Sequence, residues 1–125
     1  MKLFRAIDEL EISGTVSELA EIKRTLEKAE DGQVYVFTFD CSGCSMSYDS
    51  LEPELKVQVC SGPACATFRE EGGVTIRGGL KSIEVFASFF DFDLDSASGE
   101  HYHWDEACGS EYVATNSIPM VVSVA

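Results

Sequence analysis

Residues 74–90, VTIRGGLKSIEVFASFF, combine a β-branched run, two glycines and apolar residues at helical spacing. This order predicts a short strand, a turn and an amphipathic helix. Residues 10–26, LEISGTVSELAEIKRTL, have the same order 64 positions earlier. The corresponding pairs are Ile12 and Ile76, Gly14 and Gly78, Leu19 and Ile83, Ile22 and Phe86, and Leu26 and Phe90.

The flanking sequence extends this repetition into two units. Phe4 and Arg5 align with Phe68 and Arg69, and GQVYVF at 32–37 aligns with GEHYHW at 99–104. The chain is therefore predicted to repeat a ββαββ unit, in residues about 1–60 and about 64–125. Two copies are too few for a solenoid, so we expect them to share one core in a single domain, residues 1–125. The predicted class is α+β: one twisted, mainly antiparallel sheet with two helices on one face.

Local patterns place the elements of each unit. Thr15 and Glu18 predict a capping box at the start of the first helix. Residues 40–53 and 105–117 are expected to be loops, and Pro53 and Pro119 to stand at the head of closing strands. Strands are predicted over residues 2–7, 10–13, 33–39, 54–60, 64–70, 74–77, 100–104 and 119–124.

Charge is the strongest compositional signal. The chain has 22 acidic and 9 basic residues, a net charge of −13, and no Lys or Arg follows Lys81. Such a surface repels nucleic acid and anionic membrane and attracts a basic protein partner. The alternative interpretation is that the acidity only keeps the protein soluble.

The sequence contains no apolar run near the roughly 20 residues needed to cross a bilayer, and no signal peptide pattern, so the cytoplasm is the expected compartment. Five cysteines, an odd number, are expected to be free thiols there. They are Cys41, Cys44, Cys60, Cys65 and Cys108. A four-thiolate zinc site built from the first four remains an alternative, although their spacing is loose.

His101, His103 and Asp105 alternate along one predicted strand and therefore share a face. Two imidazoles and a carboxylate suit zinc or iron, so a small metal-binding protein or metal-dependent enzyme is the alternative function. The acidic run at 91–95 resembles the start of a calcium loop. Ser96 and Tyr102 replace its required glycine and glutamate, which excludes an EF-hand. No phosphate loop or nucleophile motif is present, so we expect neither enzyme activity nor a cofactor.

Four segments together resemble the Immunity protein 32 family of bacterial polymorphic toxin systems: ISGTVSELAEI, VTIRGGLKSIEVFASFF, His-x-His at 101–103 and SIPMVV at 117–122. The resemblance covers most of the chain. It departs in the cysteine-bearing loop 40–53 and in CGSEY at 108–112. It implies an immunity protein that binds and neutralises a cognate toxin domain stoichiometrically. A basic, nuclease-type toxin would suit the acidic surface.

The candidate partner-binding residues are the acids and aromatics that follow the last basic residue. Strand alternation places the Tyr102 and Trp104 pair opposite the His101 and His103 pair, so only one pair can lie on an open face. The expected contact residues are Asp91, Asp93, Asp95, Glu100, Tyr102, Trp104, Asp105, Glu106, Glu111 and Tyr112.

Overall fold

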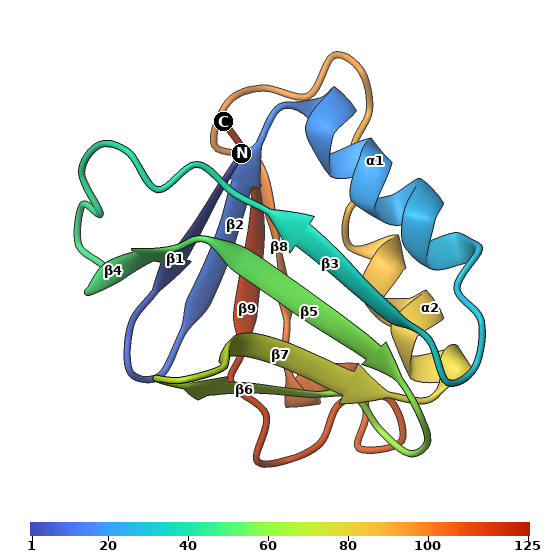
Figure 1. Cartoon of the computed structure of the whole chain (residues 1–125). Coiled ribbons are helices and arrows are strands. Elements are labelled where there is room, and N and C mark those ends of the chain that lie inside the picture. Colours follow the sequence, from blue (N-terminus) through green and yellow to red (C-terminus); the bar gives the residue numbers. More distant parts are fainter.

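The computed structural model describes residues 1–125, and its elements confirm the α+β class (Figure 1). The helices are α1 (Val16–Glu27) and α2 (Leu80–Ser88), with a short 3₁₀ helix, η1 (Glu106–Cys108). The strands are β1 (Lys2–Arg5), β2 (Leu10–Gly14), β3 (Val34–Thr38), β4 (Ser50–Glu52), β5 (Glu54–Val59), β6 (Cys65–Arg69), β7 (Gly73–Gly78), β8 (His101–Trp104) and β9 (Met120–Val124).

The strands form two sheets, so the prediction of a single sheet is wrong. Sheet A has the order β4-β1-β2-β9-β8 and sheet B the order β3-β5-β7-β6. Five of the seven strand pairings are antiparallel, as expected, while β2 with β9 and β5 with β7 are parallel. The hairpin β1–β2 pairs with the last strands of the chain, and the hairpin β6–β7 pairs with strands from the first half. Because these pairings join distant segments, the local sequence pattern does not reveal them.

The two parallel pairings have corresponding registers. In sheet A, Leu10 lies opposite Met120, and in sheet B, Val74 lies opposite Leu55. The hairpins differ from the sequence alignment by one residue. Arg5 pairs with Leu10 whereas Phe68 pairs with Val74, so Phe68 takes the register position of Arg5 and not that of Phe4. Each sheet thus contains strands from both halves of the chain.

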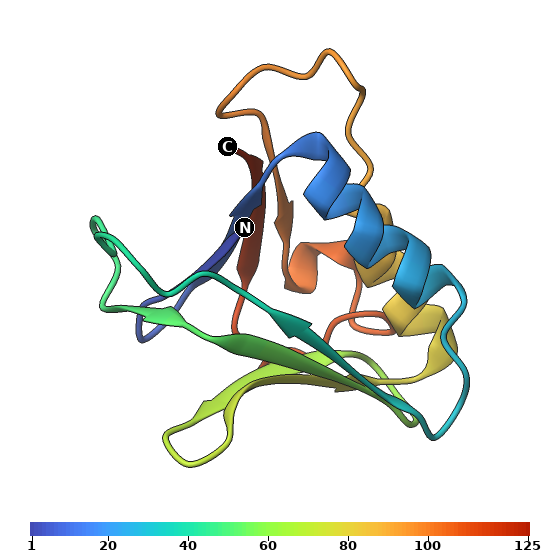
Figure 2. The same ribbon diagram turned by 45° about the horizontal axis from the view of Figure 1, so that its top comes forward.

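The core lies between the two sheets and the helices. Figure 2 shows the sheets diverging as a wedge, with the two helices on its open side. The helices pack against each other, and their apolar residues join one cluster of 23 buried residues from all layers. The predicted capping box of α1 is confirmed: the Glu18 N–H donates to Thr15 Oγ1 at 3.2 Å, and the Thr15 N–H donates to Glu18 Oε1 at 2.9 Å. Neither helix has the length and apolar composition needed to span a bilayer.

Two short segments also link the sheets, one by chain connection and one by backbone pairing. Pro53 separates β4 in sheet A from β5 in sheet B, so one extended segment changes sheet at this residue. The sequence analysis missed β4 because it has three residues and pairs only with β1. The segment after η1 runs beside β6, where Ala64 bridges Val113. This segment covers the β6 edge, which would otherwise expose unpaired backbone groups.

Candidate functional site

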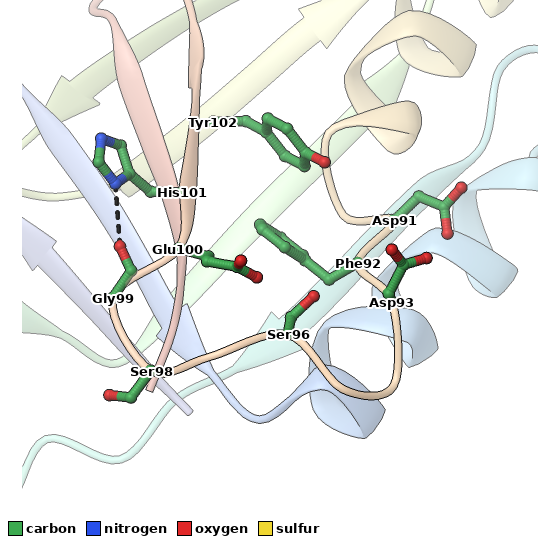
Figure 3. Close-up of a pocket in the computed structure, with 9 residues that line it drawn as sticks. All are labelled: Asp91, Phe92, Asp93, Ser96, Ser98, Gly99, Glu100, His101 and Tyr102. Carbon is green, nitrogen blue, oxygen red and sulfur yellow. Dashed lines mark hydrogen bonds between the residues drawn. The ribbon is translucent and has the colours of Figure 1, made fainter.

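A hollow of about 650 Å³ lies between the end of α2 and the start of β8 (Figure 3). Both aromatic and acidic side chains line it, and no Lys or Arg does. Volumes of this size are typical of pockets that hold a ligand or a protruding side chain. The nine lining residues are Asp91, Phe92, Asp93, Ser96, Ser98, Gly99, Glu100, His101 and Tyr102.

The chain positions this hollow by anchoring both ends of the loop 91–100. On one side the loop follows Phe90, which lies just after α2 and is buried in the core. On the other side the Gly99 N–H donates to the Val124 carbonyl at 2.8 Å, and the Val124 N–H donates to the Glu100 carbonyl at 2.9 Å. Gly99 has a φ of 93°, which favours glycine. The loop therefore returns directly into the edge of sheet A.

An aromatic pair forms the apolar part of the hollow. Phe92 stacks on Tyr102 with 4.7 Å between ring centroids and 27° between planes. Phe89 meets the edge of Tyr102 at 6.4 Å. These contacts hold the Tyr102 ring in place, and its 45% exposure leaves it open to a partner. A rigid, half-exposed tyrosine is the kind of side chain that anchors protein interfaces.

Carboxylates surround this aromatic pair. Figure 3 shows Asp91 and Asp93 beyond Phe92, with Glu100 approaching from the strand. All three are exposed, and none forms an ion pair. His101 is the only lining residue that can carry a positive charge, and its Nδ1 lies 3.0 Å from the Gly99 carbonyl oxygen. The hollow can therefore accept a cationic group against an aromatic surface.

The structure brings together four of the ten predicted contact residues: Asp91, Asp93, Glu100 and Tyr102 line the hollow. Asp95 is exposed on the same loop. Placing Trp104 on a contact surface was wrong, because its side chain is fully buried against Phe86 at a 5.0 Å centroid distance. Tyr102 and Trp104 share one face of β8, but Trp104 packs on Phe86 in the core whereas Tyr102, at the loop end of the strand, still reaches solvent.

The remaining four predicted residues lie beyond the other end of β8 (Figure 1). The Asp105 carboxylate accepts the Ala107 N–H at 2.9 Å and caps η1, which is a structural role. Glu106 and Glu111 are exposed, and Tyr112 is half-buried. The predicted acidic surface is therefore divided between two ends of one strand.

The predicted metal ligands do not assemble. His101 and His103 are neighbours, with ring centroids 5.0 Å apart, but Asp105 faces η1 and does not join them. No three His, Cys, Asp or Glu side chains are placed to hold a metal ion. The five cysteines are separate thiols, of which Cys41 and Cys44 are exposed.

Phe92 is the main site residue that the sequence analysis missed. It lies within the acidic run 91–95, whose carboxylates were interpreted as resembling the start of a calcium loop. An apolar residue between two aspartates was the available signal, but its neighbour Leu94 has the same setting and is 91% exposed. Phe92 differs from Leu94 in that its ring packs on Tyr102, and the sequence pattern does not show this contact.

Comparison of the chain with protein-family models, curated proteins and solved structures gave no match.

Proposed function

We propose that this protein is a stoichiometric inhibitor of a basic protein partner, in the manner of the immunity proteins that the sequence resembles. The observation that carries the proposal is the hollow at residues 91–102, which combines a stacked Phe92 and Tyr102 with unpaired carboxylates. A lysine or arginine of the partner fits this chemistry. Its alkyl stem packs on the rings while its charge meets the acids.

The proposed partner is a toxin domain of nuclease type, acting in the same cytoplasm. A nuclease active site is basic because it binds phosphates, so an acidic inhibitor associates with it rapidly and in the correct orientation. Binding without turnover requires no cofactor. The absence of an assembled metal-ligand set leaves no observation in favour of the metal-dependent alternative.

We also propose that the chain is a duplicated ββαββ unit whose copies exchange strands. The corresponding registers of Leu10 with Met120 and Val74 with Leu55 support this interpretation. In such a duplication, the second copy has a longer helix–strand connection than the first. The hollow at 91–102 lies at this longer connection. The extra length then supplies the acidic loop.

The test is co-expression with the toxin domain encoded next to the gene, followed by co-purification and affinity measurement at low and high salt. We expect rescue of growth and a complex that weakens as salt increases. The triple variant Asp91→Asn, Asp93→Asn, Glu100→Gln is expected to lower affinity by about tenfold or more, because charge pairs at a partner surface each contribute about 0.2–1 kcal/mol.

The matched control is Asp8→Asn, Asp31→Asn, Glu71→Gln. It changes the net charge equally at three exposed turn residues outside the hollow. If the control weakens the complex as much as the triple variant, the hollow has no specific role and only total charge matters. If no complex forms and growth is not rescued, the proposed function is wrong.

A further inference from the structure

A second hollow, on the outer face of sheet B, has the opposite charge. Its volume is about 280 Å³, and eight residues line it, none of them acidic or apolar. They are Lys56, Gln58, Thr67, Arg69, Gly72, Gly73, Thr75 and Arg77. Three of the nine basic residues of an otherwise acidic protein therefore meet at one place.

Strand register explains how these side chains converge. Lys56 pairs with Thr75, which pairs with Thr67, so the three form one row across β5, β7 and β6. Gln58 pairs with Arg77 in the next row. Side chains at alternate positions point to the same face, so both rows project outward from the core. Most of the lining is thus positioned by three paired strands of one sheet.

Glycine keeps this face open at the hairpin end. Gly73 pairs with Arg69, and a Cβ placed on Gly73 would have no atom within 4 Å. A Cβ on the neighbouring Gly72 would lie 4.0 Å from the Arg69 Cβ, so a side chain at Gly72 would occupy the space beside Arg69. The φ of 71° at Gly73 further restricts the position to glycine.

The two arginines of the hollow are left without internal ion-pair partners. Lys56 lies 4.0 Å from Glu54, at the limit of an ion pair, while Arg69 and Arg77 form no ion pair. Both arginines are exposed in a chain that has 22 acidic residues available. Like charges gathered in this way repel one another, and a bound anion would offset that repulsion.

We propose that this hollow binds a phosphate-type oxyanion, either free or as the phosphoryl group of a small molecule. Arginine presents a planar set of N–H donors that matches the oxygens of phosphate, and the lysine adds a point charge. The hydroxyls of Thr67 and Thr75 and the amide of Gln58 supply neutral donors. The volume lies just below the usual range of small-molecule pockets, ~300–1,000 Å³, and the lining offers no surface to an apolar group.

This site is separate from the acidic hollow in charge, sheet and strands, so it does not depend on the proposed function. The net charge of −13 opposes any anion at long range. At physiological salt this repulsion is screened beyond about 8 Å, and the local cations then dominate.

The test is an amide NMR titration of the full chain with inorganic phosphate, with chloride replaced so that ionic strength stays constant. We expect saturable shifts at Thr67, Thr75 and Arg77, with half-saturation at about millimolar phosphate. A parallel titration with glycerol phosphate distinguishes the two sources. Tighter binding of the ester assigns a phosphorylated small molecule, and equal or weaker binding assigns the free ion.

Arg69→Gln and Arg77→Gln are each expected to weaken phosphate binding by about tenfold, because hydrogen bonds to charged groups are the strong ones. Arg24→Gln, which removes the same charge from exposed α1, is the matched control and is expected to leave binding unchanged. Phosphate should also raise the thermal unfolding midpoint of the wild type and not that of the Arg69→Gln, Arg77→Gln double variant.

Non-saturating shifts, or equal loss of binding in Arg24→Gln, would overturn the proposal. So would a single-stranded oligonucleotide that binds the same residues more tightly than either phosphate probe, because the site would then serve a polymer. Phosphate binding that survives in the triple acidic variant, together with loss of the toxin complex, would separate the two sites.

Discussion

The guanidinium carbon of Arg5 lies 3.6 Å from the centre of the Phe68 ring. Arg5 belongs to β1 in sheet A and Phe68 to β6 in sheet B, so this contact joins the two sheets. Arg5 Nε also donates to Glu52 Oε2 at 3.3 Å. Both members of this ion pair are mostly buried, with side chains 21% and 11% exposed.

Replacing Arg5 with Met keeps the stem and removes the charge. We expect the free energy of unfolding to fall by about 1–3 kcal/mol, because the cation–π contact is lost and Glu52 keeps a mostly buried charge without its cation. Urea denaturation measures this loss. Arg24→Met, at an exposed ion pair on α1, should change stability by less than about 0.5 kcal/mol. A double-mutant cycle with Phe68→Leu isolates the ring contact, and a coupling energy of zero would contradict it.

Gly78 and Gly14 end equivalent strands, but alanine should affect them differently. A Cβ on Gly78 would lie 2.7 Å from the Ala64 Cα, which is backbone and cannot move aside. On Gly14 the nearest atom is the flexible Met1 Cγ at 3.0 Å. Gly78→Ala should therefore lower the unfolding free energy by about 1–3 kcal/mol. Gly14→Ala should change it by less than about 1 kcal/mol. Equal effects in urea denaturation would refute this difference.

Tyr48 should ionise at higher pH than a free tyrosine. Its burial, and then its hydrogen bond to Glu11 at 2.8 Å, raise the pKa of the phenol well above its usual value. A raised pKa means that the folded state favours the neutral phenol. This stabilisation is complete below pH about 10 and is lost as the pH rises above that value.

A spectrophotometric pH titration of the phenolate band tests this expectation. The Tyr48 step should lie well above the pH at which a free tyrosine ionises. Tyr48→Phe should remove only this step and flatten the dependence of stability on pH above about 10. Ionisation of Tyr48 near pH 10 in the folded protein would show that burial and the Glu11 contact do not stabilise the neutral phenol.

The cysteines should react with a thiol reagent in a defined order. Cys41 and Cys44 are exposed on the loop 40–53, whereas burial raises the pKa of the Cys65 thiol. Because the thiolate is the reactive form, Cys65 should be modified later than the loop pair. Peptide mapping by mass spectrometry after timed labelling measures the order, with the urea-unfolded protein as the reference in which all five react. Early modification of Cys65 would contradict its burial.

Part of the candidate site could be predicted from composition alone. The absence of Lys and Arg after Lys81 identified an acidic C-terminal region. It could not separate Asp91 and Glu100, which line the hollow, from Asp105, which caps η1. That separation depends on how the loop 91–100 is anchored to β9. The basic hollow was not predicted either, because Lys56, Arg69 and Arg77 are far apart in sequence and meet only through strand pairing.

Features that depend only on neighbouring residues could be predicted from the amino-acid pattern. The Thr15 and Glu18 capping box, the hairpin β6–β7 and the shared face of Tyr102 and Trp104 on β8 all follow from local geometry. Tertiary structure alone decided that the strands divide into two sheets and that Trp104, and not Tyr102, is fully buried. Both outcomes depend on burying apolar faces that come from the two halves of the chain. The free energy gained by this burial is set by long-range strand pairing, which a local pattern does not encode.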